Sequence, residues 1–158
     1  MADDVVINKA ASIERAVARA REEYYRDPAS FSLDFTRQDA AILNIQRACE
    51  AALDLGQHLI RRDRLGVPQS ARDVFTTLER AGRLPPELAS SLRRMVGFRN
   101  IAVHEYQALS LPVVVAVIEH GLQDLERFAA LSLQWEGSHP ADRSERSGGE
   151  GEPRSSER

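Results

Sequence analysis

The sequence has a single cysteine and no long apolar run, and each of these shortages excludes a class of protein. Cys49 alone cannot form an internal disulfide framework or a cysteine-based zinc site. The longest apolar stretch, residues 111–118, is far shorter than a membrane-spanning helix and is interrupted by Pro112. The N-terminus is acidic where a secretory signal peptide would be basic. We therefore expect a cytoplasmic protein of a reducing compartment that makes no use of a membrane.

Aromatic residues and lysine are also scarce. Only 6% of the 158 residues are aromatic, so aliphatic side chains must fill most of the core. The basic residues are 20 arginines and one lysine, Lys9, and the formal net charge is −3. A negative net charge argues against a polybasic coat for nucleic acid or for a membrane surface. Arginine is nevertheless the better bidentate ligand for phosphate, although codon bias produces the same excess.

The chain divides into a part that can fold and a polar tail. Residues 137–158 contain five Ser, four Gly and two Pro but no Val, Ile, Leu, Met, Phe, Trp or Tyr. Such a segment cannot bury enough apolar area to offset the entropy lost on ordering. We therefore predict one helical domain over residues 1–136 and a disordered tail over residues 137–158.

The spacing of apolar residues before the tail is helical throughout. Apolar side chains recur every three or four positions over residues 6–24, 42–59, 86–96 and 112–133, and a shorter helix is expected over 70–82. No segment alternates with period two for long enough to predict a strand. The sequence therefore predicts an all-α fold, an antiparallel bundle of four main helices and one short helix joined by brief loops.

Local signals predict several helix ends. Thr36 is expected to cap the second helix, because Asp39 follows it in the first turn, and Ser70 has the same relation to Asp73. Gly82 suits the end of the short helix. Gly56 lies inside the second helix, where it costs about 1 kcal/mol relative to alanine. A close helix crossing explains such a glycine, as does chance.

Most polar residues carry no catalytic or metal-binding pattern. Neighbouring acids point to different faces of a helix, and the scattered serines define no catalytic triad. Cys49 lies on an apolar stripe and is expected to be a small core residue. The histidines show no ligand spacing, and no metal site is predicted. They are His58, His104, His120 and His139.

In one segment, residues 95–106, polar side chains stand in an apolar run. The informative ones are Arg99, Asn100, His104 and Tyr106. One interpretation is an amphipathic helix whose polar face contains a histidine by chance. On an ideal helix, Asn100 and His104 share a face and Arg99 aligns with Tyr106, whereas Arg99 and His104 are about 140° apart. The last two would converge if the helix is distorted near Gly97, or if two copies meet at a symmetric cleft.

The spacing Arg99-x4-His104, with Asn after the Arg and Tyr two positions after the His, resembles the signature of the HEPN superfamily of helical ribonucleases. The longer pattern Gly-Phe-Arg-Asn-x3-His-x-Tyr is similar to the HepT-type toxins, as is the N-terminal segment 7–15. The resemblance spans roughly residues 5–133. It implies a homodimeric endoribonuclease, the toxin of a toxin–antitoxin pair, that uses no metal or other cofactor.

The resemblance also implies a role for each polar residue of the motif. RNA carries its own nucleophile, the 2′-hydroxyl next to the scissile phosphate. His104 would move a proton to or from that hydroxyl or the leaving oxygen, and Arg99 would hold the phosphate through its fork. Asn100 would orient the imidazole or donate to the phosphate. The expected products end in a 2′,3′-cyclic phosphate and a 5′-hydroxyl.

Tyr106 matches the position that the partner of HepT-type toxins modifies. The resemblance implies that this partner is the antitoxin MntA, a minimal nucleotidyltransferase that consumes ATP and transfers AMP to Tyr106. The added bulk and negative charge would keep RNA phosphate away. A half-buried aromatic at a helix end is the structural interpretation of the same residue.

Two arginine clusters give moderate support to an RNA site. Residues 61–64 carry a local charge of +2 and residues 83–99 of +3. We regard Arg93 and Arg94 as candidate RNA phosphate contacts, although both clusters also fit solvated helix ends.

Two other functions fit the sequence. One is a non-catalytic helical partner that binds substrate or nucleotide for a minimal nucleotidyltransferase. The other is an interaction module whose motif is fortuitous. Neither would need both Arg99 and His104.

Overall fold

In a computed structural model the described residues, 3–137, fold into six α-helices and contain no strand. The helices are α1 (Asp4–Tyr25), α2 (Phe35–Asp63), α3 (Ala71–Arg80), α4 (Pro86–His104), α5 (Leu111–Ala116) and α6 (Leu122–Gly137). Two 3-10 turns, η1 (Pro28–Leu33) and η2 (Tyr106–Ala108), and a π segment, η3 (Val117–Gly121), lie between them. The all-α prediction is confirmed.

The last two α-helices form one continuous element with the π segment between them. The backbone stays right-handed helical at Ala116, Val117 and Leu122, so the chain from Leu111 to Gly137 does not turn back. The bundle therefore has four long helices and the short α3, as the apolar spacing predicts. Gly137, expected to open the tail, instead ends α6, and the rest of the predicted disordered tail lies outside the described residues.

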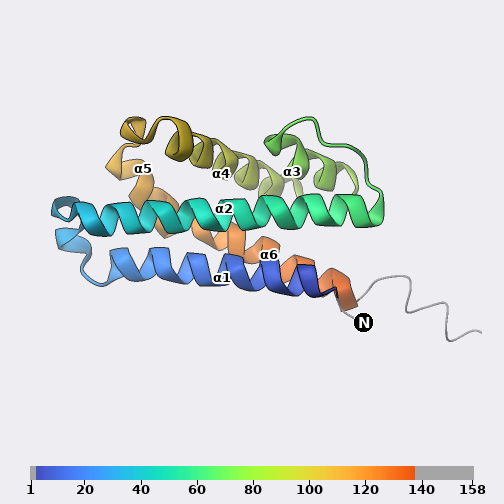
Figure 1. Ribbon diagram of the computed structural model, residues 1–158, viewed down its shortest axis with the longest axis horizontal. Helices are drawn as coiled ribbons and strands as arrows, with labels where there is room; N and C mark the ends of the chain where they lie inside the picture. The colour runs from blue at the N-terminus through green and yellow to red at the C-terminus, as the bar shows by residue number, and fades with distance from the viewer. Residues whose placement is uncertain (1–2, 138–158) are drawn as a thin grey trace, which may run out of the picture.

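The helices pack side by side around α2. Figure 1 shows α1 running antiparallel to the longer α2, with α3 and α4 on the other side of α2 and α6 crossing behind. The start of α1 lies next to the end of α6, where the Asp3 amide donates to Glu136 Oε2 at 3.0 Å. No helix within residues 3–137 has the length and apolarity to cross a membrane.

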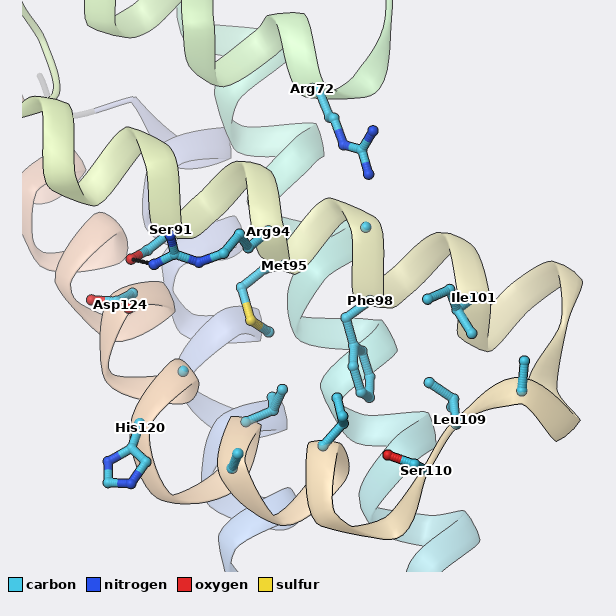
Figure 2. A pocket seen from close by; sticks show the side chains of 16 residues that line it. Arg72, Ser91, Arg94, Met95, Phe98, Ile101, Leu109, Ser110, His120 and Asp124 are labelled. Atoms are coloured by element: carbon cyan, nitrogen blue, oxygen red, sulfur yellow. Dashed lines mark hydrogen bonds between the residues drawn. The ribbon is translucent and has the colours of Figure 1, made fainter.

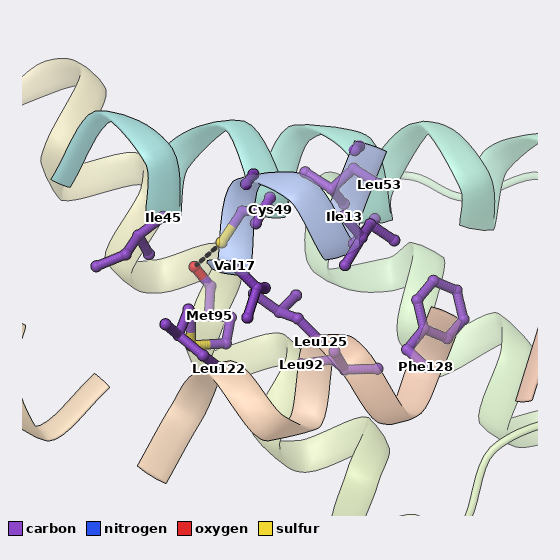
Figure 3. Packing of buried hydrophobic residues seen from close by; sticks show 14 of the residues in the cluster. Ile13, Val17, Ile45, Cys49, Leu53, Leu92, Met95, Leu122, Leu125 and Phe128 are labelled. Carbon is purple, nitrogen blue, oxygen red and sulfur yellow. Dashed lines mark hydrogen bonds between the residues drawn. The ribbon is translucent and has the colours of Figure 1, made fainter. Parts of the chain in front are cut away.

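The core is aliphatic, as the shortage of aromatic residues requires. Figure 3 shows side chains from α1, α2, α4 and α6 meeting at its centre. They include Ile13, Val17, Ile45, Cys49, Leu53, Leu92, Met95, Leu122, Leu125 and Phe128. Cys49 is only 2% exposed, which confirms that it is a core residue. Its thiol has a pKa raised to about 12 by burial, with Glu50 adding to the rise and Arg99 opposing it.

The helix ends confirm one predicted cap and correct another. Ser70 caps α3 by accepting from the Asp73 amide at 3.2 Å, and Gly82 follows that helix with φ +75°. Helix α2 starts earlier than expected, since its cap is Asp34, which accepts from the Arg37 amide at 3.1 Å. Thr36 is already inside the helix. Aspartate caps at least as well as threonine, so the earlier start is favoured.

Gly56 marks a close crossing of α2 and α3. A Cβ at this position would lie 2.6 Å from Val74 Cγ1, and Val74 is fully buried. Of the two explanations for a glycine inside the helix, the close crossing is the one observed.

Candidate active site

The last two turns of α4 hold Arg99, Asn100 and His104. This helix is uninterrupted through Gly97 and ends at His104. The distortion near Gly97 that would bring Arg99 and His104 together is therefore absent. The expected alignment of Arg99 with Tyr106 on one helix is also wrong. Glu105 leaves the helical conformation with φ −140° and ψ 52°, and Tyr106 lies in η2 beyond it.

Arg99 points from α4 toward α2. Its Nε donates to Glu50 Oε1 at 2.9 Å, Nη2 lies 3.4 Å from Glu50 Oε2, and Nη1 donates to Asn100 Oδ1 at 2.7 Å. The Arg99 side chain is 23% exposed and that of Glu50 is 43% exposed. The guanidinium is thus oriented by two partners and remains within reach of an anion from solvent.

His104 lies in solvent at the C-terminal end of α4. Its ring has no hydrogen bond to any side chain in the part of the chain that the structure describes. Asn100 directs its oxygen to Arg99, and its amide nitrogen remains available to a phosphate.

Tyr106 is joined to α2 by its hydroxyl. The hydroxyl donates to Asp39, and the side chain is 43% exposed. Partial burial raises the pKa of Tyr106 to about 12, and the neighbouring Asp39 carboxylate contributes to the rise. The phenol is therefore neutral at physiological pH, with a carboxylate placed to accept its proton.

Asp39 and Glu50 are the two residues of this site that the motif did not identify. They are eleven residues apart, which is about three turns and within roughly 20° on an ideal helix. One face of α2 therefore holds both Arg99 and Tyr106. The spacing of Asp39 and Glu50 predicts that both carboxylates lie on one face of α2. The sequence alone does not show which helix packs against that face.

The two candidate phosphate contacts on α4 differ in their surroundings. Arg93 Nη1 donates to Glu79 at 3.0 Å and to Thr76 at 3.3 Å, so its charge is already paired with α3. Arg94 is exposed and, among residues 3–137, donates only to Ser90 and Ser91. Arg94 is thus the more available of the two. Within residues 3–137 no group of three His, Cys, Asp or Glu side chains is placed to share a metal ion.

Comparison with known proteins assigns the chain to a family. Residues 13–131 match the family described as Ribonuclease HepT-like, and the chain belongs to that family. A relative from Shewanella oneidensis, named mRNA nuclease HepT, is 48% identical over 126 residues, which cover 80% of this chain and 94% of the relative. Another from Aphanizomenon flos-aquae, named tRNA nuclease HepT, is 30% identical over 79 residues, covering 50% of this chain and 54% of the relative.

Two solved structures with a similar fold are described as toxin–antitoxin complexes. One, described as a toxin–antitoxin with AMP-PNP, has 45% sequence identity and a TM-score of 0.80 and covers 84% of this chain and 99% of its own. Another is described as a tri-AMPylated Shewanella oneidensis HEPN toxin in complex with MNT antitoxin. It has 45% identity and a TM-score of 0.79 and covers 84% of this chain and 98% of its own. The family resemblance read from the motif is confirmed.

Proposed function

We propose that this protein is a metal-independent endoribonuclease, the toxin of a toxin–antitoxin pair, and that Arg99 and His104 cleave RNA at a cleft between two copies. The observation that carries the proposal is the end of α4, where a positioned arginine and an exposed histidine of the family motif share two helical turns. Neither side chain is buried in the core. Membership of the HepT-like family supports the same activity.

The regular geometry of α4 favours a dimer. On an undistorted helix Arg99 and His104 diverge by about 140°, so one chain presents them in different directions. A second copy related by a two-fold axis would bring both pairs to one substrate. Apolar side chains beside the site suit such a contact, since Leu43 is 43% exposed and Val103 is 45% exposed.

The chemistry follows from the residues and from RNA itself. The 2′-hydroxyl attacks the adjacent phosphorus while the bond from phosphorus to the 5′-oxygen breaks. His104 of one copy takes the proton of the 2′-hydroxyl, and the same residue of the second copy gives a proton to the leaving oxygen. Arg99 stabilises the charge that develops on the non-bridging oxygens. The products are a 2′,3′-cyclic phosphate and a 5′-hydroxyl.

Regulation is proposed to act through Tyr106. A relative with the same fold is an AMPylated toxin bound to MNT antitoxin, so a MntA-type nucleotidyltransferase is the expected partner here, with ATP as its donor. AMP on Tyr106 removes the proton that joins the hydroxyl to Asp39 and places a phosphodiester next to that carboxylate. Like charges repel, so the modified side chain would turn away from α2. It would then occupy the space in front of Arg99 and His104.

Cleavage by alanine variants tests the catalytic part. Arg99→Ala and His104→Ala should each lower the rate of RNA cleavage by about 10²-fold or more while the protein stays folded. Arg80→Ala, an exposed arginine at the end of α3, is the matched control and should cleave as the wild type does. Full activity of either motif variant would refute the proposed site. Activity lost on adding a chelator and restored by a metal ion would refute metal independence.

Intact mass measures the regulatory part. Incubation with the partner and ATP should add one or more AMP units to the wild type and none to Tyr106→Phe. Tyr25→Phe, which changes a tyrosine that is 53% exposed, should be modified like the wild type. Modification of Tyr106→Phe would place the acceptor elsewhere. If the wild type cleaves no RNA but binds the partner, the non-catalytic partner function applies instead.

A further inference from the structure

Arg72 reaches from the first turn of α3 to the surface of α4, where its guanidinium lies against Gly97. A Cβ at residue 97 would lie 2.9 Å from Arg72 Nη2, closer than real Cβ contacts allow. Figure 2 shows the Arg72 side chain extending from α3 toward α4. The missing side chain of Gly97 therefore provides the space that Arg72 occupies, inside the motif that contains Arg99.

The charge of Arg72 is not neutralised by the protein. Arg72 is exposed, and its guanidinium takes part in no ion pair or hydrogen bond with residues 3–137. Two other arginines differ, because Arg93 pairs with Glu79 and Arg83 pairs with Asp63. A guanidinium has five donors in a planar fork that suits phosphate. Arg72 is thus a cation without an anion, with its guanidinium next to Gly97.

Arg72 and His104 lie over the same side of α4. Gly97, Ile101 and His104 follow one another at helical spacing, and seven residues place the first and last within roughly 20° and about 10 Å along the axis. Ile101 lies between them and is 40% exposed. A stacked nucleic-acid strand advances about 3.4 Å per nucleotide, so this distance corresponds to about three nucleotides.

A groove adjoins this side of α4. It has a volume of about 620 Å³ and runs between α4 and the segment formed by α5 and η3. Figure 2 shows Phe98, Ile101 and Leu109 directed into it. Arg72 and Arg94 are among its lining residues, and Asp124 is the one carboxylate among them. Apolar walls next to unpaired cations complement a chain of flat bases and phosphates.

We propose that Arg72 forms a phosphate subsite for single-stranded RNA, about three nucleotides or fewer from the scissile phosphate, with a neighbouring base packed in the groove beside Phe98 and Ile101. This inference rests on the proposed ribonuclease function. Gly97 is a positioning residue, because its missing side chain leaves room for the guanidinium of Arg72 to lie against α4.

Binding of labelled single-stranded RNA tests the subsite. In the His104→Ala background, so that the RNA stays intact, adding Arg72→Ala should weaken binding about three- to tenfold. It should also lower the slope of log K against log salt by about 0.7, the value for one phosphate contact to a single strand. Arg80→Ala is the matched control on the same helix and should change neither quantity. Equal affinities and slopes for the two variants would overturn the subsite.

Gly97→Ala supplies an independent test. The added methyl group should push the guanidinium of Arg72 away from α4 and weaken RNA binding measurably, but by less than Arg72→Ala does, because the end of a long side chain can shift to a nearby position. Alanine favours the helix and keeps α4 folded. The double variant Arg72→Ala/Gly97→Ala should bind no more weakly than Arg72→Ala alone. Additive losses would show that Gly97 does not act through Arg72 and would overturn its positioning role.

Two further outcomes separate this inference from its alternatives. A wild type that neither binds nor cleaves RNA would defeat the ribonuclease function, and the subsite with it. A wild type that cleaves RNA, together with an Arg72→Ala variant that cleaves normally but no longer receives AMP, would assign Arg72 to the antitoxin surface and overturn the subsite alone. Retained AMP transfer with weakened RNA binding supports it.

Discussion

Arg99 of α4 and Glu50 of α2 are joined by an ion pair in which Nε lies 2.9 Å from Oε1. The two residues are 49 positions apart in the chain, so their meeting depends on how α2 and α4 pack. Partly exposed ion pairs contribute only about 0–1 kcal/mol to stability. The main consequence of this pair is the orientation of the arginine fork beside Asn100.

Glu50 is therefore predicted to position Arg99. Glu50→Ala should lower RNA cleavage by about tenfold, which corresponds to about 1.4 kcal/mol in the barrier. Its free energy of unfolding should change by less than about 1 kcal/mol. The cleavage rate of Glu50→Gln should fall between those of the wild type and Glu50→Ala, since an amide oxygen still accepts from Nε of Arg99. Cleavage rates and denaturant unfolding curves measure both effects, and an unchanged rate for Glu50→Ala would contradict the role.

The hydrogen bond from Tyr106 to Asp39 predicts an alkaline transition. Partial burial and Asp39 raise the pKa of Tyr106 to about 12, so the folded protein holds the phenol proton more tightly than the unfolded chain. The resulting stability is fully present below about pH 10 and is lost as the pH rises toward 12. Asp39→Asn should lower the pKa of Tyr106 toward 10. Ultraviolet titration of phenolate, with the Tyr106→Phe curve subtracted, measures the pKa of Tyr106 in each protein. Equal pKa values in the wild type and in Asp39→Asn would disprove the contribution of Asp39.

The contact between Gly56 and Val74 predicts that a better helix former destabilises α2. Gly56→Ala gains about 1 kcal/mol in helix propensity but crowds a fully buried valine, which costs about 1–3 kcal/mol. The variant should be less stable by up to about 2 kcal/mol. Val74→Ala removes the obstructing methyl groups, so the double variant should lose less stability than the sum of the single variants. Additive changes in unfolding free energy would contradict the close crossing.

The contacts of the Asp3 carboxylate predict that the stability of the fold is sensitive to acid. They lie where the start of α1 meets the end of α6. Partial burial acts to raise the pKa of Asp3, but hydrogen bonds from His58, the Val5 amide and Arg62 outweigh it and lower the pKa overall. A carboxylate with a depressed pKa stabilises the fold above its unfolded pKa, and this contribution is lost as the pH falls below about 4. The melting temperature of Asp3→Asn should therefore fall less than that of the wild type between pH 5 and 3.

Asp4→Asn is the control for that measurement, because Asp4 carries the same charge one residue along and is exposed. It should follow the wild type through the acid range. Matching acid profiles for Asp3→Asn and the wild type would show that the contacts of Asp3 contribute nothing to acid stability.

The fold was predictable from local signals because each one acts within a few residues. Apolar spacing determined the long helices, prolines marked the starts of α4 and α5, and Ser70 and Gly82 marked the two ends of the short α3. The start of α2 was predicted wrongly, because Asp34 and Thr36 are both good caps and the choice depends on the neighbouring turn. There, Arg37 donates to the carbonyls of Glu23, Tyr24 and Asp27 and fixes α2 against the end of α1.

The candidate site was predictable only in part. The motif identified Arg99, Asn100, His104 and Tyr106, since all four lie within one short segment. It did not identify Glu50 and Asp39, which reach the site from α2, or Arg72, which reaches α4 from α3. The alignment of Arg99 with Tyr106 failed because the helix ends at His104, and that end was not apparent from periodicity.

The sequence by itself determined the helical class, the number of main helices and the family motif, because periodicity and residue spacing are properties of the chain alone. Tertiary packing decided what those residues meet. It turned Arg99 toward Glu50, joined Tyr106 to Asp39, and used the absence of a side chain at Gly97 to seat Arg72. The physical reason is range: helix propensity and spacing act over a few residues, whereas each of these contacts joins helices that are distant in the chain and close only in the folded bundle.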